Sequence, residues 1–209
     1  MLFAETGATE LTPGAVLLRG AVGGDDEELL DDVHRIAGIS PFRRVVTPTG
    51  KPMSVEITSC GDVGWSSDRR GYRYEKRDPT TGDSWPEMPK RFKELASKAA
   101  ARAGYATYVP DTCLINKYSV GSKMGMHQDR DERDFSQPIV SVSLGLPITF
   151  KFGGATRSGK AVKVQLTHGD VVIFGGPARL AFHGVGTLRQ GEHPLTGAAR
   201  YNLTFRVAL

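Results

Sequence analysis

The sequence predicts a single domain of mixed, mainly β class: a double-stranded β-helix, or jelly roll, in the C-terminal half and helices in the N-terminal half. Two observations indicate this fold class. From about residue 110 onward, short strand-like runs follow one another between glycines and prolines, with no helical pattern among them. The chain also contains 25 glycines and 12 prolines in 209 residues, which favours many turns and short strands over long helices.

Two helices are predicted in the N-terminal half, after a short β-like run at residues 14–22. Asp25 or Asp26 can cap the first helix, and the acidic residues that follow suit its first turn. The second helix runs from about Pro89, which suits a first helical position, to Ala103, and Gly104 ends it. The apolar stripes that these helices would bury are Leu29, Leu30, Val33 and Ile36 in the first, and Phe92, Leu95, Ala96 and Ala99 in the second.

The strand-like runs of the second half cover residues 112–120, 139–145, 148–154, 162–176, 178–185 and 200–209. In the last run, polar and apolar side chains alternate, so the two kinds point to opposite faces of the strand. Arginines are costly to bury without a partner, and the polar face therefore needs either a buried anion or solvent. The polar set is Arg200, Asn202, Thr204 and Arg206, and Asn116 and Tyr118 repeat the same spacing in the first run.

The overall composition is that of an ordinary globular protein, with 39% hydrophobic and 24% charged residues. A net charge of +4 is a mild indication of nucleic-acid binding. Cys60 and Cys113 do not form a C-x-x-C pair and are expected to be free thiols in a reducing compartment. The first residues show no signal-peptide pattern, and no run approaches the ~18 apolar residues of a membrane span. We therefore expect a cytoplasmic protein without a membrane segment.

Residues 40–88 differ in character from the rest of the chain. Turn formers are frequent, and we expect hairpins and loops that lie over the main fold instead of a second core. Basic residues alternate with aromatic ones, a combination that suits phosphates and bases, although an ordinary solvated surface is the alternative interpretation. The residues concerned are Arg43, Arg44, Arg69, Arg70, Arg73, Lys76 and Arg77, with Trp65, Tyr72, Tyr74 and Trp85.

A metal site is suggested by His127 and Asp129, which lie two residues apart in H-Q-D and would share one face of a strand. A further histidine would complete the two-histidine, one-carboxylate set that binds Fe(II) and leaves coordination positions open. His183 lies on a later predicted strand that could return opposite this pair, and it is the preferred third ligand. The other histidines are expected to be structural or exposed: His168, which is the second choice, His34 and His193.

The order of the motifs N-K-Y, H-Q-D, S-V-S-L-G, H-G-D-V-V, H-G and R-Y-N-L-T-F-R resembles that of the AlkB family, in particular its bacterial branch. Members of this family are Fe(II)- and 2-oxoglutarate-dependent nucleic-acid demethylases. The resemblance covers nearly the whole chain and includes S-P-F-R-R, M-S-V-E-I-T-S-C-G-D-V-G-W and G-Y-R-Y ahead of the jelly roll. H-x-D alone is a weak signal, whereas H-x-D, a distant histidine and R-x-N-x-x-x-R in this order are specific.

The resemblance implies one domain over residues 1–209, with a nucleotide-recognition lid at 40–88 and a jelly-roll catalytic core at 110–209. It implies that Fe(II), 2-oxoglutarate and O2 together hydroxylate a methyl group on a base nitrogen, releasing succinate, CO2 and then formaldehyde. The residues that it assigns to iron are His127, Asp129 and His183. Those that it assigns to 2-oxoglutarate are Asn116, Tyr118, Arg200, Asn202, Thr204 and Arg206.

The resemblance also implies a substrate, alkylated DNA with RNA as the alternative, and a monomeric enzyme. A flipped base would lie between Trp65 and His127, and Asp131 would accept a hydrogen bond from its exocyclic amine. The remaining contacts to the nucleotide are assigned to Tyr72, Arg73, Tyr74 and, at the rim of the pocket, Arg157. Each assignment has a structural alternative: Trp65 as a core residue, the basic cluster as a solvated face, and Asp131 as a loop charge. The neighbouring charges are expected to form a solvated rim: Arg130, Glu132, Arg133 and Asp134.

Phe174 departs from the pattern, since tryptophan is common at this position in the family. We expect the change to alter packing near the iron without contact to a ligand.

The sequence leaves two other functions open. One is a dioxygenase of the same chemistry that acts on a protein side chain or small molecule, against which the basic, aromatic segment 40–88 speaks. The other is a non-catalytic jelly-roll module, against which the intact H-x-D and distant histidine speak.

Overall fold

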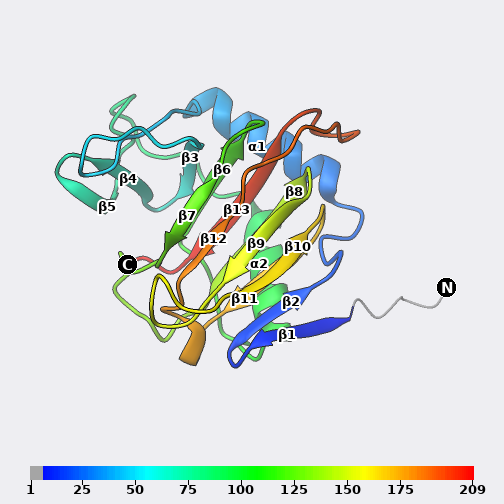
Figure 1. Ribbon diagram of the computed structural model, residues 1–209. Helices are drawn as coiled ribbons and strands as arrows, with labels where there is room; N and C mark the ends of the chain where they lie inside the picture. Colours follow the sequence, from blue (N-terminus) through cyan, green and yellow to red (C-terminus); the bar gives the residue numbers. More distant parts are fainter. Residues whose placement is uncertain (1–6) are drawn as a thin grey trace.

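Two antiparallel β-sheets lie face to face and form the predicted jelly roll (Figure 1). The computed structural model describes residues 7–209 of the chain. The larger sheet has the strand order β1 (Ala8–Thr12), β2 (Ala15–Leu18), β11 (Val171–Phe174), β8 (Ile139–Gly145), β13 (Arg200–Arg206), β6 (Thr112–Tyr118) and β3 (Glu56–Gly61). The smaller sheet has the order β10 (Val162–Leu166), β9 (Ile148–Phe152), β12 (His183–Val185) and β7 (Met124–His127). The predicted mainly β class is confirmed.

Strand β13 lies inside the larger sheet, between β6 and β8. Its alternation separates two environments, because successive side chains of a strand point to opposite faces. Tyr201, Leu203 and Phe205 pack with the residues of the helices on the outer face. The polar set points into the space between the sheets, where Arg200 is 1% exposed and Arg206 is 5% exposed. The solvent-facing alternative for these arginines is therefore excluded.

A second apolar cluster fills the space between the sheets around this polar row. Phe150 and Phe152 of β9 meet Val172 and Phe174 of β11, with Ile148 beside them. Burial of each such side chain contributes roughly 1.5–3 kcal/mol of hydrophobic free energy. The polar row thus lies in a largely apolar and water-poor interior.

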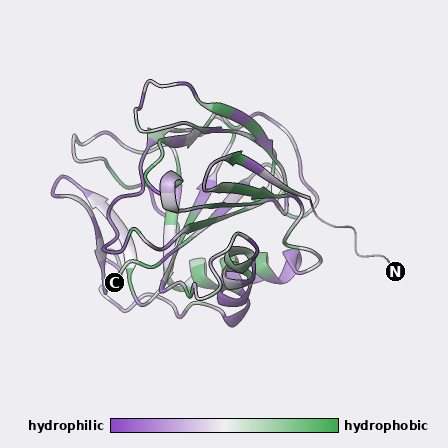
Figure 2. Cartoon of the chain, turned by 90° about the horizontal axis from the view of Figure 1, so that it is seen from below, coloured by the Kyte–Doolittle hydropathy of each residue, from purple (hydrophilic) through white to green (hydrophobic). Residues whose placement is uncertain are grey.

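Helices α1 (Asp26–Ile39) and α2 (Lys90–Arg102) cover the outer face of the larger sheet (Figures 1 and 2). Pro89 stands one position before α2, at its N-cap, and not inside the helix. Within residues 7–209, no helix is long and apolar enough to cross a membrane. The predicted stripes are the buried faces, with Leu95 only partly buried: Leu29, Leu30, Val33 and Ile36 in α1, and Phe92, Ala96 and Ala99 in α2.

The N-terminus of α1 differs from the prediction. Asp25 occupies the N-cap position, but its side chain makes no capping hydrogen bond. The carboxylate of Asp26 instead accepts a hydrogen bond from the Nε2–H of His168 at 3.0 Å, so it links the helix to the turn before β11. The predicted side-chain cap is wrong: Asp25 makes no capping hydrogen bond, and the carboxylate of Asp26 is engaged by His168. The acidic first turn still interacts favourably with the helix dipole.

The segment predicted as a lid, residues 40–88, contributes to two different structures. Strand β3 belongs to this segment and forms the edge of the larger sheet. Strands β4 (Gly64–Asp68) and β5 (Gly71–Glu75) form a separate two-stranded sheet beside it (Figure 1). In the described part of the chain, only this β4–β5 hairpin stands apart from both main sheets. It is called the hairpin below.

Trp85 contacts the hairpin where β4 begins and β5 ends. Its Nε1–H donates to the carbonyl oxygen of Glu75 at 2.8 Å, and its ring lies against Gly64, the first residue of β4. On the other side, the guanidinium of Arg43 lies 5.1 Å from the Trp85 ring centroid and pairs with buried Asp78 at 3.2 Å. Trp85 and Arg43 therefore act as structural residues, and the predicted interaction surface reduces to the hairpin itself.

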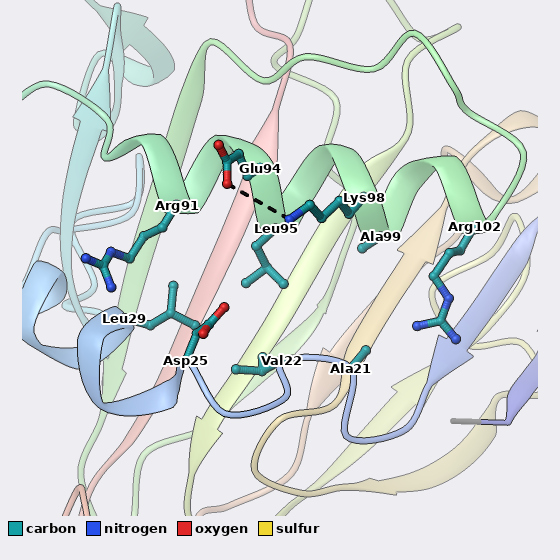
Figure 3. A pocket seen from close by; sticks show the side chains of 10 residues that line it. All are labelled: Ala21, Val22, Asp25, Leu29, Arg91, Glu94, Leu95, Lys98, Ala99 and Arg102. Atoms are coloured by element: carbon teal, nitrogen blue, oxygen red, sulfur yellow. Dashed lines mark ion pairs between the residues drawn. The ribbon is translucent and has the colours of Figure 1, made fainter. Parts of the chain in front are cut away.

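A groove of about 140 Å³ lies between the β2–α1 connection and α2 (Figure 3). It combines apolar and charged side chains: Ala21, Val22, Asp25, Leu29, Arg91, Glu94, Leu95, Lys98, Ala99 and Arg102. None of them is among the residues predicted to bind iron, 2-oxoglutarate or a base. The groove belongs to the helical layer, whereas the predicted site residues of β13 lie on the other face of the larger sheet.

The two cysteines lie directly opposite each other on β3 and β6. Both are free and buried, which confirms the expected thiols. Burial raises the pKa of Cys113 well above its usual range and keeps this thiol protonated.

The contact between Gly64 and Trp85 generates a test of the packing under the hairpin. A Cβ at Gly64 would lie 2.2 Å from the indole ring, so the ring or the strand would have to move. We expect Gly64→Ala to lower the free energy of unfolding by about 1–3 kcal/mol in urea denaturation. The control is Gly38→Ala in α1, where open space around the Cβ predicts a gain of up to about 1 kcal/mol. Equal stability of Gly64→Ala and the wild type would contradict this packing.

Candidate active site

The three predicted iron ligands meet at the end of the smaller sheet. His127 is the last residue of β7 and His183 the first of β12, and the strand register pairs them directly. Asp129 follows two residues after β7. One potential ligand atom of each residue lies within 4.8 Å of the others. Among residues 7–209, these three side chains form the group of histidine, cysteine and acidic residues that is able to hold a metal ion.

Both histidines are oriented by backbone carbonyls of their own segments. Nδ1 of His127 lies 2.9 Å from the oxygen of Gly125, and Nδ1 of His183 lies 3.1 Å from the oxygen of Ala181. The Nε2 atoms lie 3.6 Å and 3.8 Å from the carboxylate oxygens of Asp129. An imidazole that donates through Nδ1 leaves the Nε2 lone pair for a metal. Two such histidines and one carboxylate fit Fe(II).

Burial and neighbouring charges set the protonation of these ligands. Burial, assisted by His127, lowers the pKa of His183 to about 4, so its imidazole is neutral at pH 7. Burial opposes ionisation of Asp129, but Arg206 and the two histidines outweigh it and hold the pKa of this carboxyl well below its usual range. Nη2 of Arg206 donates to Oδ2 of Asp129 at 2.8 Å. The group therefore presents a neutral imidazole at His183 and a carboxylate at Asp129.

The segment after β7 is a loop and not a strand. The prediction that His127 and Asp129 share one face of a strand is wrong, because β7 ends at His127 and residues 128–137 have no regular structure. The carboxylate of Asp129 reaches the histidines because the chain turns there, held by side chains from elsewhere. Sequence periodicity carries no information about such a turn.

Glu132 was expected in a solvated rim, and this prediction is wrong. It is 6% exposed and accepts a hydrogen bond from the hydroxyl of Tyr74 at 2.6 Å. Its two oxygens also lie 3.1 Å from Nε of Arg206 and 3.0 Å from Nη2 of Arg179. Arg179 is 3% exposed and was not singled out from the sequence, because an arginine beside a Gly-Pro turn is usually solvated. The other rim residues are exposed or partly exposed: Arg130, Arg133 and Asp134.

The polar row predicted for 2-oxoglutarate contains buried groups without partners. Nη2 of Arg200 donates to the hydroxyl of Ser143 at 2.8 Å, but its Nε and Nη1 have no hydrogen-bond partner. Nη1 of Arg206 and Oδ1 of Asn116 are likewise buried and unpartnered. Unpaired buried polar groups are costly, and two arginines with free donors match the two carboxylates of 2-oxoglutarate. The residues present therefore fit this co-substrate.

Two members of the row already have protein partners. Nδ2 of Asn202 donates to the hydroxyl of Ser141 at 2.8 Å and to the carbonyl of Val142 at 3.0 Å. The hydroxyl of Thr204 donates to Oδ1 of Asn202 at 2.9 Å. In the register of β6 and β13, Asn202 lies opposite Asn116. Asn202 and Thr204, which lie between the two arginines on β13, are thus fixed by hydrogen bonds within the protein.

Arg200 and Tyr118 are register partners on β13 and β6. Burial lowers the pKa of Arg200 to about 10 and raises the pKa of Tyr118 to about 12. Both groups therefore stay protonated at pH 7, and both are hydrogen-bond donors toward an anion between the sheets.

The hairpin contacts the loop after β7 through one cross-strand pair. Trp65 and Tyr74 are register partners on β4 and β5. The Nε1–H of Trp65 donates to Oδ2 of Asp131 at 2.8 Å, and the hydroxyl of Tyr74 reaches Glu132, the next residue. The hairpin therefore lies against the same loop that carries Asp129. Trp65 is half-buried at this contact and packs against the apolar cluster between the sheets.

Two further residues of the predicted base-binding set differ in their availability. The ring of Tyr72 is stacked on Trp65, with centroids 5.4 Å apart and an angle of 18°, and Tyr72 is 47% exposed. Arg73 forms ion pairs with Asp68 at 2.9 Å and Glu75 at 2.5 Å, so its charge is balanced within the hairpin. The exposed cations of the hairpin region are Arg69, Arg70, Lys76 and Arg77.

Arg157 lies in the exposed connection between β9 and β10. Its guanidinium stands 5.6 Å from the ring centroid of Phe182, the residue that precedes His183. This contact brings a positive charge to the neighbourhood of the metal group. The structure thus places Arg157 on the ring of Phe182, the sequence neighbour of His183, although Arg157 and His183 lie 26 residues apart in the sequence.

Phe174 contacts one of the predicted iron ligands, contrary to expectation. Its buried ring lies 4.9 Å from the ring of His183 and 5.4 Å from that of Phe152, measured between centroids. The expectation that Phe174 packs near the metal group agrees with this contact. Which residue faces it depends on how the two sheets stack, and a single sequence does not contain that information.

The remaining histidines lie elsewhere. Nδ1 of His168 accepts a hydrogen bond from the backbone N–H of Gly145 at 2.9 Å, its Nε2–H donates to Asp26, and its ring stacks on His193 at 4.5 Å. His34 is exposed on α1. The geometry therefore agrees with His183 as the third ligand, and His168 has the structural part that was expected of it.

Comparisons with known proteins agree with this site. A family model for the 2OG-Fe(II) oxygenase superfamily matches residues 14–206. The chain is 52% identical over 198 residues to the alpha-ketoglutarate-dependent dioxygenase AlkB of Salmonella typhimurium, covering 95% of this chain and 92% of that protein. It is 50% identical over 205 residues to AlkB of Escherichia coli, covering 98% and 95%. The structure of OsALKBH1 matches with a TM-score of 0.82 and 32% identity, covering 96% of this chain and all of that one.

These similarities extend over both sheets, the hairpin and the polar row, and are not confined to one motif. Alpha-ketoglutarate is another name for 2-oxoglutarate, the dianion that fits the unpartnered arginines between the sheets. The chain belongs to the AlkB family of the 2OG-Fe(II) oxygenase superfamily and is an alpha-ketoglutarate-dependent dioxygenase.

Proposed function

We propose that this dioxygenase repairs DNA by removing N-linked methyl and other alkyl groups from bases such as 1-methyladenine and 3-methylcytosine. Bound Fe(II) supplies the oxidation, in which O2 and 2-oxoglutarate give succinate and CO2 and the hydroxylated methyl group leaves as formaldehyde. The observation that carries the proposal is the aromatic and basic hairpin docked on the loop of Asp129. Relatives named a DNA N(6)-methyladenine demethylase, from Arabidopsis thaliana, and a tRNA demethylase, from Schizosaccharomyces pombe, support it.

In this proposal, the space between the sheets holds both the metal and the co-substrate. The metal ligands are the Nε2 atoms of His127 and His183 and the carboxylate of Asp129. Arg200 and Arg206 pair with the two carboxylates of 2-oxoglutarate, since their free donors are otherwise unmatched. The other residues that hold the co-substrate or brace its site are Asn116, Tyr118, Asn202 and Thr204.

The base has to leave the helical stack before its methyl group reaches the metal. Trp65 and His127 provide the aromatic faces that hold the flipped base. One oxygen of Asp131 is bound by Trp65, and the other is assigned to the exocyclic amine of the base. The remaining contacts to the nucleotide and its phosphates are assigned to Tyr72, Arg73, Tyr74 and Arg157.

The proposal also favours nucleic acid over the alternative substrates. A dioxygenase for a protein side chain or small molecule has no need of exposed cations beside stacked aromatic rings, which are the features of the hairpin. Methylated RNA is the second candidate substrate. We further propose a cytoplasmic enzyme, since both thiols are reduced, and a monomer, since one chain supplies every site residue.

The proposed reaction predicts a product that is easily measured. After anaerobic purification with Fe(II), the protein should release formaldehyde from oligonucleotides that carry 1-methyladenine or 3-methylcytosine, with an equal amount of succinate. His127→Ala should abolish both products while the fold is retained, and His34→Ala, an exposed histidine on α1, should not. Consumption of 2-oxoglutarate without formaldehyde from any methylated strand would contradict the substrate and favour the protein or small-molecule alternative.

The unpartnered guanidinium of Arg200 predicts opposite effects on stability and binding. Arg200→Met removes a buried charge, so the metal-free variant should be at least as stable as the wild type. With Mn(II) in place of iron, 2-oxoglutarate at about 100 times its Kd should stabilise the wild type by about 2.7 kcal/mol and leave the variant unchanged. Thermal unfolding measures both effects. A wild-type shift in the variant would contradict the assignment of Arg200.

The stacking role of Trp65 predicts a split between two activities. Trp65→Ala should lower kcat/KM for a methylated oligonucleotide by about 10-fold or more, since base stacking contributes about 1–3 kcal/mol. Turnover of 2-oxoglutarate without DNA should change much less. Trp65→Phe is the matched control, because it keeps an aromatic face and loses only the Nε1–H bond to Asp131. Equal loss of both activities in Trp65→Ala would argue against stacking.

A further inference from the structure

Asp129 differs from the two histidines in how its backbone is held. His127 and His183 lie on β7 and β12, where the ladder between the strands positions them. Asp129 lies in the irregular loop of residues 128–137, which has no such ladder. A metal site needs its ligands held within about 0.5 Å of their working positions. Another group must therefore fix this loop.

One guanidinium closes the loop from end to end. Nη1 of Arg179 donates to the carbonyl oxygen of Asp129 at 2.6 Å, and Nε donates to the carbonyl oxygen of Gln137 at 2.9 Å. Nη2 donates to the carboxylate of Glu132, between these two, at 3.0 Å. The three acceptors come from the beginning, the middle and the end of the loop. Arginine alone offers donors in a fixed plane that can serve all three.

Arg179 also connects this loop to the other ligand-bearing segment. It follows the short 3-10 helix η1 (Gly176–Ala178) and precedes His183 by four residues. Its guanidinium is buried, and the ring of Phe135, which belongs to the loop, covers it at 5.2 Å. Two parts of the chain that lie 50 residues apart are thus joined at one side chain.

We propose that Arg179 is a positioning residue for the metal site. This proposal rests on the assignment of iron to His127, Asp129 and His183 in the proposed function. It sets the main chain at Asp129 so that the carboxylate faces the Nε2 atoms of both histidines. Its hydrogen bonds go to the loop and not to the ligand atoms, so its effect is on the geometry of the site. Loss of these bonds weakens metal binding first and turnover as a consequence.

Glu132 provides the negative charge that the buried guanidinium of Arg179 needs. A guanidinium in an apolar interior needs a carboxylate partner, and Glu132 provides one for Arg179 and for Arg206. Because Tyr74 of the hairpin donates to the same carboxylate, the hairpin and the loop share one anchor. The metal loop is therefore held from both the hairpin side and the η1 side.

The test is the affinity for Mn(II), followed by loss of the free-ion signal in electron paramagnetic resonance. Arg179→Lys keeps the positive charge beside Glu132 but cannot make three directed bonds. We expect its Kd for Mn(II) to rise about 10- to 100-fold, the usual effect of losing a group that orients a metal ligand. At saturating metal, KM for the methylated oligonucleotide should stay at its wild-type value. Hydrogen exchange of the metal-free variant should accelerate in residues 128–137.

Arg19→Lys is the matched control. Nη1 of Arg19 donates to the carbonyl oxygen of Gln165 and the carboxylate of Asp170, a similar pattern on another part of the fold. This variant should bind Mn(II) as the wild type does. A second variant, Phe135→Ala, leaves Arg179 in place and uncovers it, and should raise the Kd for Mn(II) by a smaller factor.

The outcomes distinguish the positioning role of Arg179 from the iron assignment itself. Wild-type Mn(II) affinity and wild-type exchange of the loop in both Arg179→Lys and Phe135→Ala would overturn the positioning role alone. Failure of the wild-type protein to bind Mn(II) would overturn the iron assignment and this inference with it. A larger Kd that is confined to the Arg179 and Phe135 variants supports the proposal.

Discussion

Charge that is buried between the two sheets has to be balanced, and the ion pair of Arg206 with Asp129 is the contact on which the site depends. Arg206 comes from β13 inside the larger sheet, and Asp129 comes from an irregular loop beside the smaller sheet. Their pairing ties the loop to the larger sheet. Glu132 and Arg179 add one further charge of each sign, so the four side chains together are neutral. The loop thus gains a defined position without regular secondary structure.

The same balance explains why the polar row can receive a dianion. Arg200 has no carboxylate partner, and burial lowers its pKa, which shows that its charge is costly in this position. A molecule with two carboxylates relieves this cost and that of the free donors of Arg206. In the proposed function, this imbalance, which is built into the folded chain at some expense to its stability, favours binding of 2-oxoglutarate.

The hairpin makes hydrogen bonds to two carboxylates of the loop after β7. The hydroxyl of Tyr74 donates to Glu132, and the Nε1–H of Trp65, its cross-strand partner, donates to Asp131, the residue before Glu132. The aromatic residues assigned to the base and the loop that carries Asp129 therefore share their anchoring groups. A conformational change in the loop is therefore expected to move the hairpin through the carboxylates of Asp131 and Glu132. A movement of the hairpin is expected to shift the loop through the same two groups.

The sequence by itself determined the elements with a regular period and the residue types of the site. Alternation in β13 and the stripes of α1 and α2 identify buried faces because the period of a strand or helix is a local property. The residue types of His127, Asp129 and His183 suggested a metal site, and the resemblance of the motif order to the AlkB family implied the 2-oxoglutarate chemistry. The burial of Glu132, the bracing by Arg179 and the contact of Phe174 with His183 were decided only by the tertiary structure. They depend on which distant segments meet across the two sheets, and local periodicity does not encode those contacts.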